Sequence, residues 1–504
     1  MMGDLVIGVD CSTTAAKAVV WDARGRSHAQ GRAEFPLSTP RHGWAEQNPE
    51  DWWTATREAV RRAAQGVDSR RLVALSITHQ RETFACLTED GHSLRPAMLW
   101  LDTRAVDQVA QFGTPEVHEI TGKPPNPTPA WYKLLWLTEH EPDTLVRTGR
   151  IADVQAFLVH RLTGRWHTCW ASADPLGLVD MRTFGYHDGL VKQAGLQPSQ
   201  LPTLFAPGDV LGHIGADIAA DLNLPPEIPV VAGVGDGQSA GLGCGVVRPG
   251  TAYLNLGTGM ISGSYSDEYS FASEFRVLAG AVPRSYAFET FIGGGTYNIS
   301  WFVDKFTGVD SRALGLDLSA EQILETAAAQ IPPGAEGLLC LPYWAGALTP
   351  YWDPHARGSL VGLTGRHGKS HVYRAILEGL AFEQRLLTDG QADVVGRPIT
   401  DIIALGGGSR SALWCSILAD VLQRPVRLAG ESESTCLGSG MLAAAAVGLQ
   451  PGIREAAGSM SSTTRVYEPD QLRSSTYDGL YQTYRQLYPR LREVFHQLSA
   501  VSAT

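Results

Sequence analysis

The chain has 504 residues, of which 44% are hydrophobic and 18% charged, as is ordinary for a globular protein of more than one domain. Its net charge of −11 argues against an extended nucleic-acid surface, which would need clustered Lys and Arg. No apolar run reaches the ~18–20 residues of a membrane span, and the start does not resemble a signal peptide. We therefore expect a cytoplasmic protein without nucleic-acid or membrane partners. The seven cysteines stand singly and predict buried thiols.

Residues 5–22 predict two strands joined by a turn rich in hydroxyl groups. Hydroxyls and a lysine at such a turn can bind a phosphate, and a carboxylate at the end of the first strand could hold Mg²⁺ through water. An exposed hairpin loop is the alternative, because loops also favour Ser and Thr. The candidate ligand-binding residues are Asp10, Ser12, Thr13, Thr14 and Lys17.

Alternating apolar residues predict a strand over 73–77, and polar residues follow it at Gln80-Arg-Glu-Thr83. In open α/β sheets ligands bind beyond the strand ends, so Arg81 and Glu82 could hydrogen-bond a polyhydroxylated substrate. A surface ion pair between them is an equally good interpretation. Trp100 could form a wall of the same pocket, although core packing is the usual role of a tryptophan.

The stretch 229–245 holds a short apolar strand, a dense run of glycines and one carboxylate, Asp236. Glycines allow a ligand to approach the backbone closely, so this turn is a candidate for the chemistry. A plain strand-to-helix turn with Asp236 as its N-cap is the alternative. Gly237–Gly241 also matches the G-x-S-x-G pattern of serine hydrolases, but Ser239 does not directly follow the strand as that motif requires.

We place a domain boundary at Arg248-Pro-Gly250, after which three more glycine turns occur. The strand–turn–strand at 251–262 repeats the design of the first hairpin, with Thr258 at its tip. Two such turns facing each other across a cleft could bind a nucleoside triphosphate and position it for phosphoryl transfer. A long helix is expected from His371 to about Thr388, closed by Gly390. A P-loop is excluded, because residue 363 is leucine where the motif needs its first glycine.

Together these elements resemble the FGGY family of carbohydrate kinases, which belongs to the actin-like ATPase superfamily. The resemblance runs from about Val6 to beyond Tyr467 and implies an α/β fold of two ribonuclease H-like domains with a cleft between them. Residues 1–247 would bind the sugar and supply the catalytic base, and residues 248–504 would bind the nucleotide. The matching elements are the hairpin at 10–17, Gln80-Arg-Glu-Thr83, the loop at 233–245, Gly257-Thr-Gly259, Tyr351-Trp-Asp-Pro354 with Arg357-Gly358, and Gly406-Gly-Gly408.

The resemblance also implies roles for individual residues, with ATP and Mg²⁺ as cofactors. Asp236 would be the general base, and Asp10 would assist Mg²⁺ through water. The residues expected to contact the acceptor are Arg81, Glu82, Trp100, Asp236 and Gln238. The residues expected to contact the nucleotide are Ser12, Thr13, Thr14, Lys17, Thr258, Gly259, Gly295, Gly407 and Gly408.

The sequence defines the acceptor of the phosphoryl group less closely than it defines the family. Gln80–Thr83 and Tyr351–Pro354 are similar to glycerol kinases, but Thr128 and Ile261 stand where those enzymes have aromatic residues. Two missing rings suggest a roomier pocket, so a ketopentose such as xylulose is the leading expectation. A kinase for a polyol (glycerol, erythritol, ribitol or xylitol) and a non-catalytic actin-like or sugar-responsive module are the alternatives. The sequence does not give the oligomeric state, and a homodimer remains one option.

Overall fold

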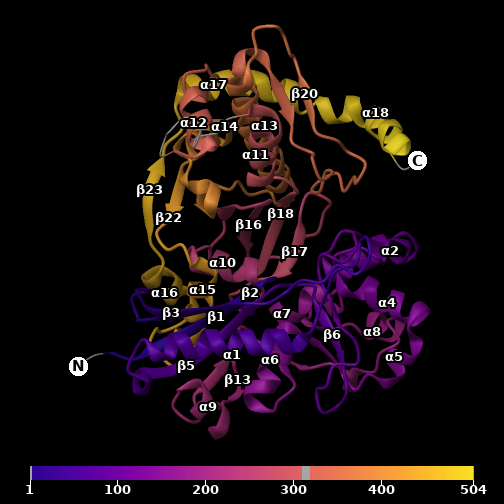
Figure 1. Ribbon diagram of the computed structural model, residues 1–504, viewed down its shortest axis with the longest axis vertical. Helices are drawn as coiled ribbons and strands as arrows, with labels where there is room; N and C mark the ends of the chain where they lie inside the picture. The colour runs from indigo at the N-terminus through magenta and orange to yellow at the C-terminus, as the bar shows by residue number, and fades with distance from the viewer. Residues whose placement is uncertain (1–2, 309–317, 503–504) are drawn as a thin grey trace.

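The computed structural model describes residues 3–308 and 318–502, which form two lobes, each built on a central β-sheet (Figure 1). The first lobe contains the six-stranded sheet and most of the N-terminal half of the chain. The second lobe contains the seven-stranded sheet. Within these ranges no helix is both long and apolar enough to cross a bilayer.

The two sheets share one topology. In the first, three antiparallel strands in the order β3-β2-β1 are followed by β5 and β14, which run parallel to β1. In the second, β18-β16-β15 repeat the antiparallel part, and β21 and β22 run parallel to β15. This confirms the predicted α/β fold with two ribonuclease H-like domains. The strands are β1 (Leu5–Cys11), β2 (Ala15–Trp21), β3 (Ser27–Glu34), β5 (Leu72–His79), β13 (Val210–His213) and β14 (Pro229–Val231) in the first sheet, and β15 (Thr251–Leu256), β16 (Met260–Ser266), β17 (Arg276–Ala279), β18 (Tyr286–Ile292), β21 (Asp401–Leu405), β22 (Val426–Ala429) and β23 (Thr463–Tyr467) in the second.

Helices cover both sheets, and four short strands form a separate sheet in the first lobe, β4-β7-β6-β8. The remaining strands are β4 (Glu46–Gln47), β6 (Phe84–Leu87), β7 (Ala97–Met98), β8 (Arg150–Asp153), β9 (His167–Cys169), β10 (Val179–Asp180), β11 (Gly185–Tyr186), β12 (Thr203–Phe205), β19 (Leu339–Leu341) and β20 (Ser359–Val361). The helices of the first lobe are α1 (Pro49–Gln65), α2 (Val106–Phe112), α3 (Pro115–Thr121), α4 (Ala130–His140), α5 (Pro142–Arg147), α6 (Val154–Thr163), α7 (Trp170–Ala173), α8 (Asp188–Gln193) and α9 (Ala216–Leu222). Those that follow are α10 (Asp236–Gly243), α11 (Thr296–Phe302), α12 (Ala320–Ala328), α13 (Lys369–Val395), α14 (Ala412–Leu422), α15 (Ser434–Ala446), α16 (Ile453–Met460), α17 (Gln471–Tyr484) and α18 (Leu487–Ser502).

Helix α13 is longer than the sequence predicts, because it continues through Gly390 to Val395. A glycine inside a helix costs only about 1 kcal/mol relative to alanine, which the packing of a long buried helix readily offsets. The helix ends instead at Gly396, whose φ of 69° is the left-handed conformation that glycine adopts without strain.

Two glycine-containing helices, α10 and α15, cross at the junction of the lobes (Figure 1). A Cβ atom on Gly438 would lie 1.9 Å from the carbonyl oxygen of Ser239, and one on Gly243 would lie 1.9 Å from that of Ser434. Only glycine permits this approach. Helix α15 also packs on β1, so this late segment of the chain belongs to the hydrophobic core of the first lobe. The proposed domains 1–247 and 248–504 are therefore joined through these helices.

Candidate active site

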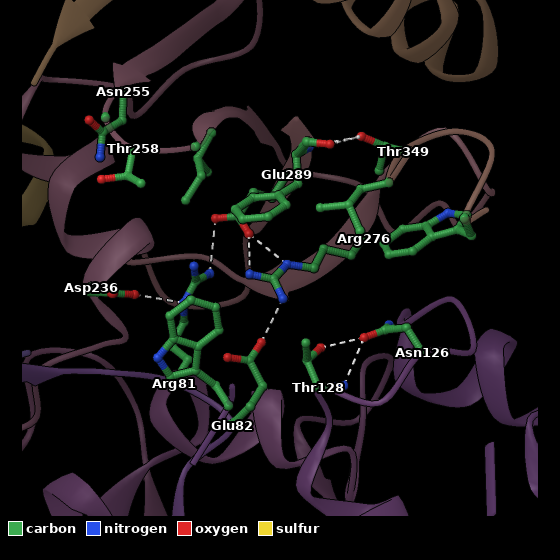
Figure 2. A pocket seen from close by; sticks show the side chains of 17 residues that line it. Arg81, Glu82, Asn126, Thr128, Asp236, Asn255, Thr258, Arg276, Glu289 and Thr349 are labelled. Atoms are coloured by element: carbon green, nitrogen blue, oxygen red, sulfur yellow. Dashed lines mark hydrogen bonds and ion pairs between the residues drawn. The ribbon is translucent and has the colours of Figure 1, made fainter. Parts of the chain in front are cut away.

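A cavity of about 260 Å³ lies between the lobes, beyond the ends of the central strands (Figure 2). Both lobes contribute to its walls, which are mostly polar on the side of the first lobe. The lining residues are Arg81, Glu82, Trp100, Asn126, Thr128 and Asp236 from the first lobe, and Asn255, Gly257, Thr258, Gly259, Ile261, Arg276, Glu289, Phe291, Leu348, Thr349 and Trp352 from the second. The structure thus brings together three candidate acceptor residues, the candidate base and the Gly257-Thr-Gly259 turn.

Asp236 is the first residue of α10, directly after the turn that follows β14. Its side chain is 40% exposed, and its Oδ1 lies 2.7 Å from Nε of Arg81. The backbone N–H of Gly237 also donates to Oδ1, at 2.8 Å. A carboxylate at a helix N-terminus is stabilised by the helix dipole. Asp236 does not cap the helix with its side chain, because Gly235 occupies the N-cap position, and its carboxylate lines the cavity.

Arg81 and Glu82 follow β5 and are buried, with exposed fractions of 6% and 5%. The surface ion pair considered from the sequence is therefore wrong. Glu82 has a φ of 54°, a left-handed conformation that costs a residue with a side chain roughly 1–2 kcal/mol. Such strain is commonly found at functional sites, and here it accompanies a carboxylate that lines the cavity.

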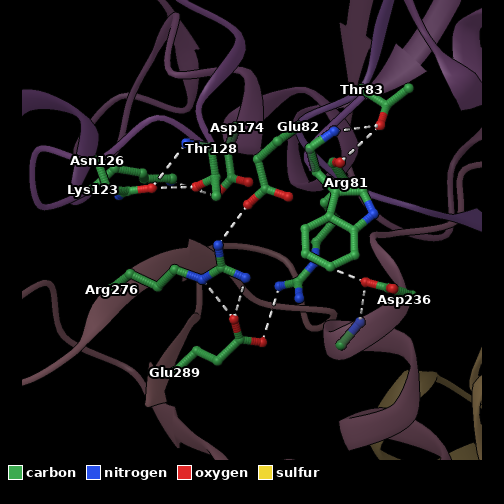
Figure 3. Close-up of polar contacts among 12 residues, drawn as sticks. Arg81, Glu82, Thr83, Lys123, Asn126, Thr128, Asp174, Asp236, Arg276 and Glu289 are labelled. Carbon is green, nitrogen blue, oxygen red and sulfur yellow. Dashed lines mark hydrogen bonds and ion pairs between the residues drawn. The ribbon is translucent and has the colours of Figure 1, made fainter. Parts of the chain in front are cut away.

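An ion-pair chain crosses the cavity from one lobe to the other (Figure 3). Glu289 of β18 is fully buried and binds Nη1 of Arg81 at 3.0 Å and Nε of Arg276 at 2.6 Å. Nη1 of Arg276 in turn lies 2.7 Å from Oε1 of Glu82. Burial alone would raise the pKa of Glu289, but Arg276 and Arg81 lower it to about 2. The sequence analysis did not identify Arg276 and Glu289 as site residues. The one sequence feature that could have indicated them is that they carry opposite charges on neighbouring strands.

Trp100 lines the cavity, and its indole N–H donates to Oγ1 of Thr13 at 3.0 Å. Thr13, expected at the nucleotide, is therefore in contact with a residue expected at the acceptor. Buried Lys133 orders this wall, because its Nζ donates to the carbonyl oxygens of Leu99 at 2.8 Å and Thr128 at 2.7 Å. Burial lowers the pKa of Lys133 to about 7.

Gln238 lies outside the cavity, in contrast to the other predicted acceptor residues. Its side chain is buried, and Nε2 donates to the carbonyl oxygens of Ala171 at 3.0 Å and Ala279 at 3.3 Å. Gln238 lies on the face of α10 that packs between the lobes, and its amide donates to one carbonyl group in each lobe. Its contacts are therefore structural, and it does not line the cavity.

The Gly257-Thr-Gly259 turn is bound to the start of α11. The N–H of Gly295 donates to the carbonyl oxygen of Thr258 at 2.8 Å, and that of Thr296 to Gly257 at 2.9 Å. A Cβ atom on Gly295 would lie 2.7 Å from the carbonyl oxygen of Gly257, so glycine permits the close approach. Thr258 and Gly259 line the cavity, whereas Gly295 supports the turn from behind.

The first hairpin places Asp10 opposite Lys17 across β1 and β2. Nζ of Lys17 is 2.5 Å from Oε2 of Glu433, just before α15. Burial, together with the charges of Asp236 and Glu433, raises the pKa of Asp10 to about 8 against the opposing effect of Lys17. Oδ1 of Asp10 is buried and has no hydrogen-bond partner in the described part of the chain.

The other hydroxyls of the hairpin turn are arranged more simply. Oγ of Ser12 donates to the carbonyl oxygen of Ala15 at 2.9 Å, and Thr14 is exposed. In the second lobe Gly407 is exposed, while Gly408 is buried with its Cβ position 2.5 Å from the ring of Trp414. Gly407 therefore offers open backbone surface, and Gly408 is required for packing.

Ser239, the serine of the hydrolase-like pattern, is fully buried in α10. Its Oγ donates to the carbonyl oxygen of Thr435 at 2.8 Å, where the two crossing helices meet. It does not line the cavity and has no exposed surface from which to attack a substrate. The structure gives the hydrolase interpretation no support.

Two repeated sheets with a cavity between them are the fold of the actin-like ATPase superfamily, and comparisons with known proteins identify the family. The model of the N-terminal domain of the FGGY family of carbohydrate kinases matches residues 5–243, and that of the C-terminal domain matches residues 252–447. The chain belongs to this family and is a carbohydrate kinase. The predicted family and enzyme class are thereby confirmed.

Relatives are similar to this chain over nearly its whole length. The gluconokinase of Bacillus subtilis is 25% identical, covering 99% of this chain and 98% of the relative. The xylulose kinase of Bacillus subtilis is 28% identical, covering 97% of each. The crystal structure of xylulose kinase from Rhodospirillum rubrum has a TM-score of 0.90 at 28% identity, covering 98% of this chain and 100% of that one. The named substrates of these proteins differ.

Proposed function

We propose that this kinase transfers the γ-phosphoryl group of ATP to a hydroxyl of a neutral sugar or polyol, with Asp236 as general base. A ketopentose such as xylulose is the favoured acceptor. The observation that carries the proposal is the shared cavity, which Asp236, Arg81 and Glu82 border from the first lobe and Thr258 borders from the second. A base, donors for hydroxyl groups and a phosphate-side turn thus meet in one space.

In the reaction, the acceptor oxygen bonds to the γ-phosphorus as the bond to the bridging oxygen of ADP breaks. Asp236 accepts the proton of the attacking hydroxyl, which becomes acidic only as the new bond forms, so placement of the base matters more than a high pKa. Arg81, fixed by Glu289, holds the carboxylate of Asp236 in place. The two lobes exclude water, which would otherwise compete as the acceptor.

Mg²⁺ would be held by Asp10 through water and by the phosphates of the nucleotide, where it would neutralise negative charge during transfer. The buried Oδ1 of Asp10, which lacks a hydrogen-bond partner among the described residues, fits that role. No group of three or more His, Cys, Asp or Glu side chains in the described chain could hold an ion by itself. Lys17 would exchange Glu433 for phosphate, and the other contacts to the nucleotide would come from Ser12–Thr14, Thr258, Gly259, Gly295, Gly407 and Gly408.

The charges of the cavity favour a neutral acceptor. Its described lining has three carboxylates (Glu82, Asp236 and Glu289) against two guanidinium groups (Arg81 and Arg276), an excess of one negative charge. Both guanidinium groups already contact carboxylates. An acidic sugar would bring a further negative charge close to these carboxylates without an unpaired cation to receive it.

The size of the cavity favours an acceptor longer than glycerol. Its volume of about 260 Å³ approaches the ~300 Å³ lower end of pockets that hold small-molecule ligands. Thr128 and Ile261, which replace two aromatic residues of glycerol kinases, both belong to the lining. A polyol of four or five carbons is the second candidate, because Arg81 and Glu82 retain the pattern that resembles glycerol kinases.

A coupled assay of ADP release tests the proposal across xylulose, ribulose, xylitol, ribitol, erythritol, glycerol and gluconate. We expect the highest kcat/KM with a neutral acceptor of four or five carbons, and with xylulose before the polyols. A clear preference for gluconate would contradict the charge argument, and a preference for glycerol would contradict the size argument. ATP binding without turnover of any acceptor would favour a non-catalytic module.

A further inference from the structure

Arg276 occupies a position in the cavity that the sequence did not reveal. It lies on β17, at the edge of the second sheet, directly opposite Glu289 of β18 in the strand register. Its side chain is 13% exposed and reaches across to the first lobe. Nε and Nη2 contact Oε2 of Glu289 at 2.6 and 2.5 Å, and Nη1 contacts Oε1 of Glu82 at 2.7 Å (Figure 3).

These contacts fix the guanidinium group without using all its donors. An arginine has five N–H groups, and the three contacts require one each from Nε, Nη1 and Nη2. The second N–H of Nη1 and of Nη2 is left to donate to an oxygen atom in the cavity that Arg276 lines. A planar group held on two sides is a pre-organised donor, because little rotamer freedom is lost when a ligand binds.

Arg276 is separated from the candidate base by Arg81. The contacts run in the order Asp236, Arg81, Glu289, Arg276, and both close-up views place Arg81 between Asp236 and Arg276 (Figures 2 and 3). An acceptor whose reacting hydroxyl is at Asp236 would have its next hydroxyl near Arg81. Only an acceptor with further carbons extends to Arg276, beside Thr128 and Asn126 of the opposite wall.

We propose that Arg276 is a specificity-determining residue, which binds a distal hydroxyl or carbonyl oxygen of a neutral acceptor of four or five carbons and so selects against glycerol. The inference rests on the proposed function and deepens it. Arg276 acts together with Glu82, since the carboxylate of Glu82 can accept from the hydroxyl to which Arg276 donates. The pair forms one recognition unit with residues from both lobes.

The variant Arg276→Lys tests this role, because lysine keeps the charge and loses the forked geometry. We expect kcat/KM for the longest neutral acceptor that the wild type phosphorylates to fall at least about tenfold, the loss of one charge-assisted hydrogen bond. This fall in kcat/KM should come from a higher KM for the acceptor. For the shortest accepted acceptor we expect a clearly smaller fall in kcat/KM, and for KM of ATP a change within about twofold. The rise in Tm caused by the long acceptor without nucleotide should shrink as well.

Arg427→Lys is the matched control, since Arg427 pairs with Asp401 on the second sheet, outside the cavity lining. Arg427→Lys should leave kcat/KM unchanged for both the long and the short acceptor. If Arg276→Lys does not fold, Arg276→Gln, which keeps an N–H donor, is assayed in the same way. An equal loss for long and short acceptors, with the acceptor-induced rise in Tm intact, would overturn the inference. A wild type that phosphorylates only a sugar acid would instead refute the proposed function, whatever the variants do.

Discussion

Asp10→Asn is expected to stabilise the metal-free protein while it removes kinase activity. Asp10 is a carboxylate in a site where burial, Asp236 and Glu433 all disfavour its charge. The pKa of Asp10 is raised from 3.8 to about 8. Between these two values the native state keeps a proton that the unfolded state releases, so stability falls as pH rises toward 8. An asparagine of the same shape carries no charge to be buried.

The change in the free energy of unfolding follows from the change in the proton affinity of Asp10. Each tenfold change in proton affinity corresponds to about 1.4 kcal/mol. A pKa change from 3.8 to about 8 therefore limits the stability gained by Asp10→Asn to about 6 kcal/mol at pH 8 and above. Part of the Asp10 side chain is exposed to solvent, which reduces the cost. If the variant gains about a quarter of this upper limit, its free energy of unfolding rises by about 1.5 kcal/mol. Its Tm would then rise by about 3–6 °C, if the first lobe unfolds as a unit of some 250 residues.

Thermal unfolding in EDTA at pH 8.5 and pH 5 measures this difference. We expect the variant to exceed the wild type clearly at pH 8.5, and the advantage to shrink at pH 5, where the wild-type carboxyl is protonated. MgATP should raise Tm of the wild type more than that of the variant. An unchanged or lower Tm at pH 8.5 would refute the electrostatic reasoning, and retained kinase activity would refute the role in Mg²⁺ binding.

Two further predictions concern buried groups. Glu383 accepts hydrogen bonds from the hydroxyls of Tyr343 and Tyr484, and burial raises its pKa from 4.5 to about 7. In a pH series of thermal melts, the Tm of the wild type should therefore fall as the pH rises through this range. Glu383→Gln should make Tm depend less on pH. Lys133→Met should raise the acceptor KM roughly tenfold with KM of ATP unchanged, because the carbonyls of Leu99 and Thr128 lose their common donor. Equal changes in both KM values would contradict that positioning role.

The two repeated hairpins were predictable because their signals are local, whereas the two-domain fold followed from the family resemblance. Each hairpin is a short apolar strand, a turn of small or hydroxyl residues and a second strand, and such patterns determine strand pairing between neighbours in the chain. Asp10 and Asp236 could be identified for the same reason, since each comes at or just after the end of a predicted strand. Arg81 and Glu82 followed from the same rule.

The remaining part of the site depends on contacts between distant segments. Arg276 meets Glu289 through the register of β17 and β18, and Glu82 through the approach of the two lobes, neither of which the sequence pattern fixes. Gln238 follows Asp236 on the same short helix, yet its side chain lies on the face that packs between the lobes. The return of α15 to the first lobe is likewise a matter of topology, visible in the sequence only as a run of small residues.

The kinetics of Asp236→Asn with the best neutral acceptor test the central claim most directly. Asparagine keeps the shape of the side chain but cannot take the proton, so kcat should fall by about 10²–10⁴ while ATP affinity, measured by calorimetry, is retained. Ser239→Ala on the same helix is the control and should lose little activity, because the Ser239 hydroxyl donates to the carbonyl of Thr435 and does not line the cavity. A variant at position 236 that phosphorylates its acceptor at close to the wild-type rate would contradict the account.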